Sequence, residues 1–261
     1  GKLKEAEQST RKAIEINPNF ANAYLNLGNI LKDLGKLKEA EQSTRKAIEI
    51  NPDFANAYCN LGVILKDFGK LKEAEVYTRK AIKLNPTHAT AYSNLGGILK
   101  DLGKLKESEH STRKAIELNP NLAIAYYSLS LFKNFDASKM LRDKLFSKKL
   151  LNNNSKKDQV NIFFARSNIL HSELNFKESS KYLQQANNLK LKLNPSNVEY
   201  LLNKSKKLLF ESNKEVVIEE VSTKFPESIF IVGMPRSGST LLESILSMNN
   251  NVYDLGEKNI L

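Results

Sequence analysis

The chain has 261 residues, of which 41% are hydrophobic and 26% charged, enough for one or two packed domains. No apolar run approaches the roughly 18 residues of a membrane-spanning helix, and no basic segment followed by an apolar one opens the chain. Cys59 is the single cysteine, which excludes an internal disulfide and a cysteine-based metal site and makes a reducing cytoplasm the expected location. The three histidines are widely separated, so no bound metal is predicted.

The net charge of +11 raises the question of a nucleic-acid partner. Arg-Lys pairs recur from Arg11 to Arg113, each beside glutamates on the same predicted helix, which is typical of a solvated helix face. Lys and Asn are also abundant in segments without any pattern. We therefore interpret the positive charge as compositional bias rather than a nucleic-acid footprint, and we expect neither a nucleic acid nor a membrane as partner.

An internal repeat organises the first half of the chain. The stretch "GKLKEAEQSTRKAIEINP" begins at Gly1 and returns almost unchanged at Gly35, with close variants at Gly69 and Gly103, a spacing of 34 residues. Self-similarity at such a period indicates stacked units that cannot bury their apolar faces alone. Small and large apolar residues recur at helical spacing in two groups, so each unit is predicted to contain two helices. The first unit has Tyr24, Leu27, Gly28 and Leu31 in one helix, and Leu37, Ala40, Thr44 and Ala47 in the other.

Small residues at Gly28 and Ala40 are expected to let the paired helices approach closely, and Asn51-Pro52 ends the second helix because proline offers no N–H group. The pattern of these residues, which recurs from Tyr58 and from Tyr92, resembles the tetratricopeptide repeat (TPR) family. The resemblance implies a mainly α protein with a TPR helical solenoid over residues 1–122, of which 1–20 are the second helix of an incomplete unit.

The repeat pattern decays after residue 122. Ala137 stands where the next turn glycine is expected, although "NFKES" at 175–179 still occupies the place of "KLKEA". We therefore assign residues 123–193 to degenerate TPR-like helices and residues 194–227, which read as two short amphipathic helices, to a helical connector.

Asparagine recurs at one position of the first helices, off the apolar stripe, at Asn26, Asn60 and Asn94. A TPR array usually presents these helices to a groove, and side-chain amides offer both a donor and an acceptor to a peptide backbone. The groove is similar to that of O-linked N-acetylglucosamine transferase, which implies a protein or peptide partner. The alternative is that these residues simply face water.

Residues 228–261 have a sequence pattern that differs from the repeats. "SIFIVG" is a compact apolar run typical of a buried parallel strand, and "STLLESILSM" has helical periodicity. A strand that leads through a tight loop into a helix collects backbone N–H groups and forms an anion site. The loop fits the nucleotide-binding template Gly-x-x-x-x-Gly-Lys-[Ser/Thr] except that Ser239 replaces the lysine, which disfavours an ATPase or a kinase.

"GMPRSGSTLLESIL" resembles the donor loop of sulfotransferases that use 3′-phosphoadenosine-5′-phosphosulfate (PAPS), closest to the tyrosylprotein and bacterial TPR-linked types. The resemblance implies that Arg236 stabilises charge on the donor and that Glu257, in "DLGE", is the general base for an acceptor hydroxyl, without a metal. Asn249 to Asn251 depart from the His-Pro that is frequent in relatives. The residues implied to bind PAPS are Pro235, Arg236, Ser237, Gly238, Ser239 and Thr240.

The sulfotransferase resemblance covers only residues 228–261, the first strand, loop and helix of a truncated α/β domain. We expect the chain to be an inactive fragment, cut at both ends, of a PAPS-dependent enzyme whose array positions the acceptor. We also expect strand 228–233 to lack sheet neighbours. The alternative function is a TPR protein–protein interaction scaffold without catalytic activity. The sequence does not distinguish a protein tyrosine, a carbohydrate and a small alcohol as acceptor.

Overall fold

The computed structural model describes residues 2–132 and 139–195, together with residue 203. These residues contain twelve helices and no strand, so the prediction of a mainly α repeat structure is confirmed for this part of the chain. The chain divides into two compact units, Gly1–Ser196 and Asn197–Leu261, and Asn203 is the one described residue of the second. Ala137, the connector and strand 228–233 lie outside the described residues. No helix among the described residues has the length and apolarity needed to cross a membrane.

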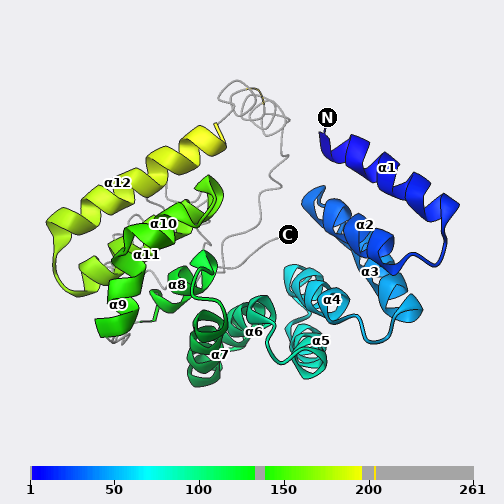
Figure 1. Ribbon diagram of the computed structural model, residues 1–261, viewed down its shortest axis with the longest axis horizontal. Coiled ribbons are helices and arrows are strands. Elements are labelled where there is room, and N and C mark those ends of the chain that lie inside the picture. Colours follow the sequence, from blue (N-terminus) through cyan, green and yellow to red (C-terminus); the bar gives the residue numbers. More distant parts are fainter. Residues whose placement is uncertain (1, 133–138, 196–202, 204–261) are drawn as a thin grey trace, which may run out of the picture. The chain divides into compact units, whose positions relative to one another are not determined.

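The helices follow one another along the chain as Figure 1 labels them. The helices of the repeats are α1 (Lys2–Ile16), α2 (Ala21–Asp33), α3 (Leu37–Ile50), α4 (Ala55–Asp67), α5 (Leu71–Leu84), α6 (Ala89–Asp101) and α7 (Leu105–Leu118). The remaining ones are α8 (Ala123–Leu129), α9 (Lys139–Phe146), α10 (Lys148–Asn152), α11 (Lys156–Ser172) and α12 (Phe176–Leu193).

Three helix pairs form the regular array: α2 with α3, α4 with α5 and α6 with α7. We call α2, α4 and α6 the first helices and α3, α5 and α7 the second helices of the three repeats. Each second helix also contacts the first helix of the following repeat, and the first helices contact one another in sequence. The first helices therefore form a continuous row. Each contacts its own second helix, and neighbouring first helices contact each other.

A glycine in each first helix sets the distance to its second helix. A Cβ atom added at Gly62 would overlap the Thr78 hydroxyl and lie 3.2 Å from the carbonyl oxygen of Ala74. Ala74 and Thr78 are both fully buried on the second helix. The same arrangement holds in the flanking repeats, at Gly28 with Thr44 and at Gly96 with Thr112. The close approach predicted from the small residues is therefore present in all three pairs.

The turn within each pair also depends on glycine. Gly35 has φ 78°, a left-handed conformation that costs little only without a Cβ atom. The N–H of Gly35 donates to the carbonyl of Lys32, and that of Lys36 donates to the carbonyl of Leu31. These two bonds satisfy two of the carbonyls in the last turn of α2 and direct the chain back along it as α3.

The core is built between repeats as well as within them. Leu27, Leu31 and Ala40 of the first repeat form one buried cluster with Ile64 of the second. Leu61, Leu65 and Ala74 form the equivalent cluster with Ile98 of the third repeat. The first and second repeats therefore complete their hydrophobic cores with an isoleucine from the next repeat, which is why the stack rather than the single unit is stable.

Helices α11 and α12 form a further pair, and α11 also contacts α8. Ser167 and Ser179 occupy the facing positions of this pair, where each hydroxyl donates to the other residue's carbonyl at 2.9–3.0 Å. The turn contains Leu174 with φ 60°, and the N–H of Asn175 donates to the carbonyl of Leu170, as in the glycine turns. The region 123–193 thus ends in a helical hairpin that keeps the turn of the repeats with different residues.

Candidate functional site: the row of first helices

The three asparagines predicted to line a groove lie on the outward side of the first helices. Asn26 is exposed, whereas Asn60 and Asn94 are half-buried. Helical spacing places Asn94 on the same stripe as Thr90, Gly97 and Asp101, and each of these is at least partly exposed. The corresponding stripe of α2 carries Asn22, Asn26, Asn29 and Asp33, and that of α4 carries Asn56, Asn60, Val63 and Asp67.

Two of these asparagines are held by the neighbouring first helix. The amide nitrogen of Asn60 donates to Oδ1 of Asn29 at 2.7 Å. The amide nitrogen of Asn94 donates to the sulfur of Cys59 at 3.2 Å. Each bond occupies one N–H and fixes the orientation of the amide, leaving its oxygen and its second N–H for a ligand. The sequence indicated the regular spacing of the asparagines but not these bonds, since their acceptors differ between repeats.

The acceptor Cys59 is itself buried in the array. Its side chain packs with Ala81 and Ala91, and burial raises the pKa of the thiol to about 11. A thiol with so high a pKa stays protonated and is a poor nucleophile at neutral pH. Cys59 therefore serves as a packing and hydrogen-bonding group at this position.

Each first helix also carries a lysine in its last turn. The ion-pair partner of this lysine differs from repeat to repeat. Lys32 pairs with its own neighbour Asp33 at 2.9 Å, whereas Lys66 reaches Asp101 of the next repeat at 3.3 Å. Lys100 is exposed and has no ion-pair partner within residues 2–132 and 139–195. Each first helix carries one lysine followed by one aspartate, so these residues add no net charge to the row, and only their pairing differs between repeats.

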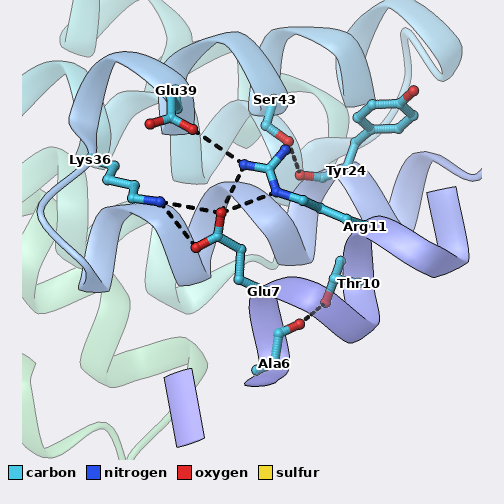
Figure 2. A network of polar contacts seen from close by, with 8 residues as sticks. All are labelled: Ala6, Glu7, Thr10, Arg11, Tyr24, Lys36, Glu39 and Ser43. Carbon is cyan, nitrogen blue, oxygen red and sulfur yellow. Dashed lines mark hydrogen bonds and ion pairs between the residues drawn. The ribbon is translucent and has the colours of Figure 1, made fainter. Parts of the chain in front are cut away.

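A network of ion pairs joins each second helix to the next. Figure 2 shows its first example, between α1 and α3. Glu7 on α1 accepts from Arg11 at 2.8 Å and from Lys36, at the start of α3, at 3.1 Å. Arg11 in turn contacts Glu39 on α3 at 3.2 Å. The side chain of Glu7 is only 12% exposed, so this carboxylate lies beneath the two cations that bridge the helices.

The same network recurs with the period of the repeat. Glu41 accepts from Arg45 and Lys70, and Glu75 accepts from Arg79 and Lys104. Partial burial acts to raise the pKa of Glu41, but the bonds from Arg45 and Lys70 outweigh it and lower the pKa overall. The bond from Lys104, followed by that from Arg79, lowers the pKa of Glu75 despite its partial burial. The sequence pattern predicts a solvated face here and does not indicate the network, because partners of each glutamate lie in different repeats.

A buried arginine ties α11 to the segment before it. The guanidinium of Arg166 donates to the carbonyls of Leu145 and Ser147 at 2.9 and 3.0 Å and lies over the rings of Phe146 and Tyr182. Burial lowers the pKa of Arg166. Arg166 is 3% exposed, so it holds the fold of this region and is not accessible to a ligand.

The residues predicted to bind and use a sulfate donor cannot be placed in this geometry. Arg236 and Glu257, the predicted catalytic pair, lie outside the described residues, as does the whole loop from Pro235 to Thr240. Their roles therefore stay predictions. Of the predicted site residues, the structure describes Asn26, Asn60 and Asn94.

Comparison with protein-family models gives matches along the repeats and at the C-terminal end. Models described as "Tetratricopeptide repeat" match residues 21–54, 55–88 and 89–122, and one described as "TPR repeat" matches residues 1–35. A model described as "Sulfotransferase family" matches residues 226–260. No curated protein matches the chain.

Several solved structures resemble the chain at low identity. The crystal structure of YrrB, titled a TPR protein with an unusual peptide-binding site, is 22% identical with TM-score 0.47, covering 77% of this chain and 100% of that one. The crystal structure of MamA is 22% identical with TM-score 0.44, covering 73% and 90%. The first TPR of Spaghetti (RPAP3), bound to the HSP90 peptide SRMEEVD, is 28% identical with TM-score 0.39, covering 40% and 83%.

The consecutive family matches coincide with the three helix pairs, each of which shows the glycine turn and the close helix approach described above. Residues 1–122 of the chain are therefore tetratricopeptide repeats.

Proposed function

We propose that the row of first helices binds a protein partner through an extended peptide segment. The observation that carries this proposal is the pair of cross-repeat bonds from Asn60 to Asn29 and from Asn94 to Cys59. These bonds hold the amides in place before a ligand arrives, which reduces the ordering cost of binding. The oxygen of each amide stays available to accept from a peptide N–H, and its second N–H to donate to a peptide carbonyl.

The spacing of the repeats suits an extended chain. Packed helices lie about 8–10 Å apart, and an extended peptide advances about 3.3–3.6 Å per residue, so neighbouring first helices correspond to about three peptide residues. Every peptide residue except proline carries a backbone donor and a backbone acceptor. Each asparagine of the row can therefore bond to the peptide backbone whatever side chains the peptide has. Affinity would come from the main chain, and selectivity from residues that differ between repeats, such as Asn29, Val63 and Gly97.

A selection from a displayed library of short random peptides against the 261-residue chain tests this proposal. Anisotropy of a labelled selected peptide then measures binding to the double variant Asn60→Ala/Asn94→Ala. Loss of two hydrogen bonds at about 1 kcal/mol each predicts a roughly thirtyfold weaker complex. Lys46→Ala, which shortens an exposed side chain on a second helix, is the matched control and should bind normally. Undiminished binding by the double variant, folded by circular dichroism, would contradict the proposal.

We further propose that the protein to which this chain belongs is a sulfotransferase that uses PAPS as donor. The match of residues 226–260 to the sulfotransferase model supports this second function, and it includes Arg236 and Glu257. In the proposed reaction the carboxylate of Glu257 accepts the proton of an acceptor hydroxyl. Arg236 and the N–H groups of Ser237 to Thr240 stabilise the charge that develops on the donor phosphate. The repeats would then bring the acceptor to this site.

Calorimetric titration with adenosine 3′,5′-bisphosphate tests the donor site in the longer parent protein that the resemblance implies. We expect binding that ATP does not reproduce, because Ser239 replaces the lysine that ATP-binding loops use. Arg236→Ala should weaken this binding, and Arg142→Ala, in α9, is a control of equal charge change that should not. A folded parent protein that produces no heat with the bisphosphate would exclude the enzyme and leave the interaction scaffold as the function.

A further inference from the structure

His88 stands at a position that is apolar in the other repeats. It precedes α6, where the chain passes from the second repeat into the third. The residues that precede α2, α4 and α8 in the same way are Phe20, Phe54 and Leu122. His88 and Phe54 have almost the same backbone conformation, with φ −76° and −78° and ψ 84° and 83°. An ionisable ring therefore takes the place of a hydrocarbon side chain at this junction.

The surroundings of Phe54 show what such a position contacts. Phe54 packs against the buried cluster at the junction of the first and second repeats, which consists of Leu25, Ala47 and Ala57. The cluster one repeat later, at the junction of the second and third repeats, consists of Cys59, Ala81 and Ala91. These residues come from α4, α5 and α6. The ring of His88 therefore lies at the edge of an apolar cluster that joins the two repeats.

One edge of this ring is closed off from water. Nε2 of His88 is buried and has no hydrogen-bond partner within the part of the chain that the structure describes. Burial lowers the pKa of His88 below its ordinary value of 6.5, because the charged ring would lose the water that solvates it. A protonated imidazole has an N–H donor at both nitrogens, so the charged form would also need an acceptor beside Nε2. The fold therefore favours the neutral ring.

The groups around the junction do not balance a charge on His88. In α4 the ionisable members are Tyr58 and Cys59, which are neutral at physiological pH. In α5, Lys80 lies over the Tyr58 ring at 5.9 Å and Lys83 is in the last turn, so both add positive charge. The first turn of α6 has no acidic residue, and its free N–H groups favour an anion over a cation. None of these three helices therefore supplies a negative group at the junction.

We propose that His88 makes the junction between the second and third repeats sensitive to acid, because protonation of its imidazole loosens the packing of α6 against α4 and α5. The contribution of the neutral ring to stability is fully present above the unfolded pKa of 6.5 and is lost as the pH falls through the lower pKa of the folded state. The bond from Asn94 to the sulfur of Cys59 crosses the same junction and would be weakened with it. This response concerns the array itself and holds whether or not a peptide binds there.

Thermal unfolding of the 261-residue chain at pH 7 and pH 5 tests the proposal. We expect the unfolding midpoint to fall by about 3 °C more in the wild-type chain than in His88→Phe, which carries the residue found at position 54. His88→Leu, with the residue of position 122, should behave like His88→Phe. The matched control is His110→Gln, which changes an exposed histidine to the residue of the equivalent position 42 and should keep the wild-type pH dependence. Equal pH dependence in the wild-type chain and both His88 variants would overturn the proposal.

Amide hydrogen exchange at the same two pH values, corrected for intrinsic rates, locates the opening. We expect acid to reduce protection in α6 and at the end of α5 more than in α2 and α3, and we expect this difference to disappear in His88→Phe. A loss of protection spread evenly over the repeats, or confined to α2 and α3, would contradict an opening at this junction even if the unfolding midpoints differ.

Discussion

The helix pair α4 and α5 and the helix pair α11 and α12 have similar turns built from different residues. In the first pair, Gly62 faces Ala74 and the turn glycine is Gly69 with φ 77°. In the second, Ser167 faces Ser179 and Leu174 takes the left-handed turn with φ 60°. The hairpin therefore does not depend on the repeat consensus. Where two helices cross closely, hydroxyl–carbonyl hydrogen bonds can take the place of a glycine that packs directly against the facing helix.

The two regions also differ in how their charged residues contribute. In the regular array, Glu41 and its equivalents join successive second helices through cations from two repeats. In the later region a buried cation, Arg166, bonds to two backbone carbonyls instead. The array therefore repeats one polar contact in successive repeats, whereas the later region has a different kind of contact at Arg166. The substitutions below test this difference.

The largest effect is expected for Arg166→Leu, which introduces the residue type that Leu27 has at the equivalent place in α2. The carbonyls of Leu145 and Ser147 would lose their donor, at about 1–3 kcal/mol for a buried group left unpaired. We expect the free energy of unfolding to fall by about 3 kcal/mol in urea denaturation. Lys181→Leu, an exposed substitution on α12, is the control. Unchanged stability of Arg166→Leu would mean that packing alone holds this region.

A smaller loss is expected for Gly62→Ala, because the added methyl group overlaps the Thr78 hydroxyl and overpacking costs about 1–3 kcal/mol. Among residues 2–132 and 139–195 the hydroxyl of Thr78 has no hydrogen-bond partner, so its removal breaks no bond there. The double variant Gly62→Ala/Thr78→Ala should therefore be more stable than the sum of the single effects predicts. Strict additivity in a double-mutant cycle would show that the hydroxyl is not the obstacle.

The turn residues should give effects of opposite sign in the two pairs. Leu174→Gly should stabilise the chain by about 1 kcal/mol, because a left-handed conformation costs a residue with a Cβ atom about 1–2 kcal/mol. Gly69→Leu should destabilise it by a similar amount, since Gly69 also has a positive φ. Thermal unfolding of both variants against the wild-type chain measures the difference. A loss of stability in Leu174→Gly would mean that contacts of the leucine side chain outweigh the strain.

The smallest effect is expected from acid. The bonds from Lys104 and Arg79 lower the pKa of Glu75 below its ordinary value of 4.5. Its contribution to stability is therefore fully present above pH 4.5 and is lost as the pH falls through the lower pKa of the folded state. The midpoint of urea unfolding should fall less between pH 7 and pH 3 in Glu75→Gln than in the wild-type chain. Equal pH dependence in the two proteins would show that the ion pairs of Glu75 do not contribute to stability.

The sequence predicted the repeat helices well because their signals are local. Gly28, Leu31 and Pro52 identify the packing face and the helix end within one unit. It could not predict the bond from Asn60 to Asn29 or the bridge from Lys36 to Glu7, since both depend on how successive units face each other. The turn at Leu174 was also unpredictable from local preference, because leucine rarely adopts a positive φ.

The candidate site was predicted in part for the same reason. The positions of Asn26, Asn60 and Asn94 follow from the period of the repeat, but the orientation of their amides depends on the neighbouring helix. The predicted donor loop around Arg236 and the predicted base Glu257 stay predictions.

NMR of the asparagine side-chain amides during titration with a selected peptide would show whether the row of first helices binds an extended peptide. We expect shifts for Asn26, Asn60 and Asn94, and none for the loop residues Asn51, Asn85 and Asn119, whose side chains accept from backbone N–H groups. Shifts confined to the loop residues, or to side chains of the second helices, would contradict such binding.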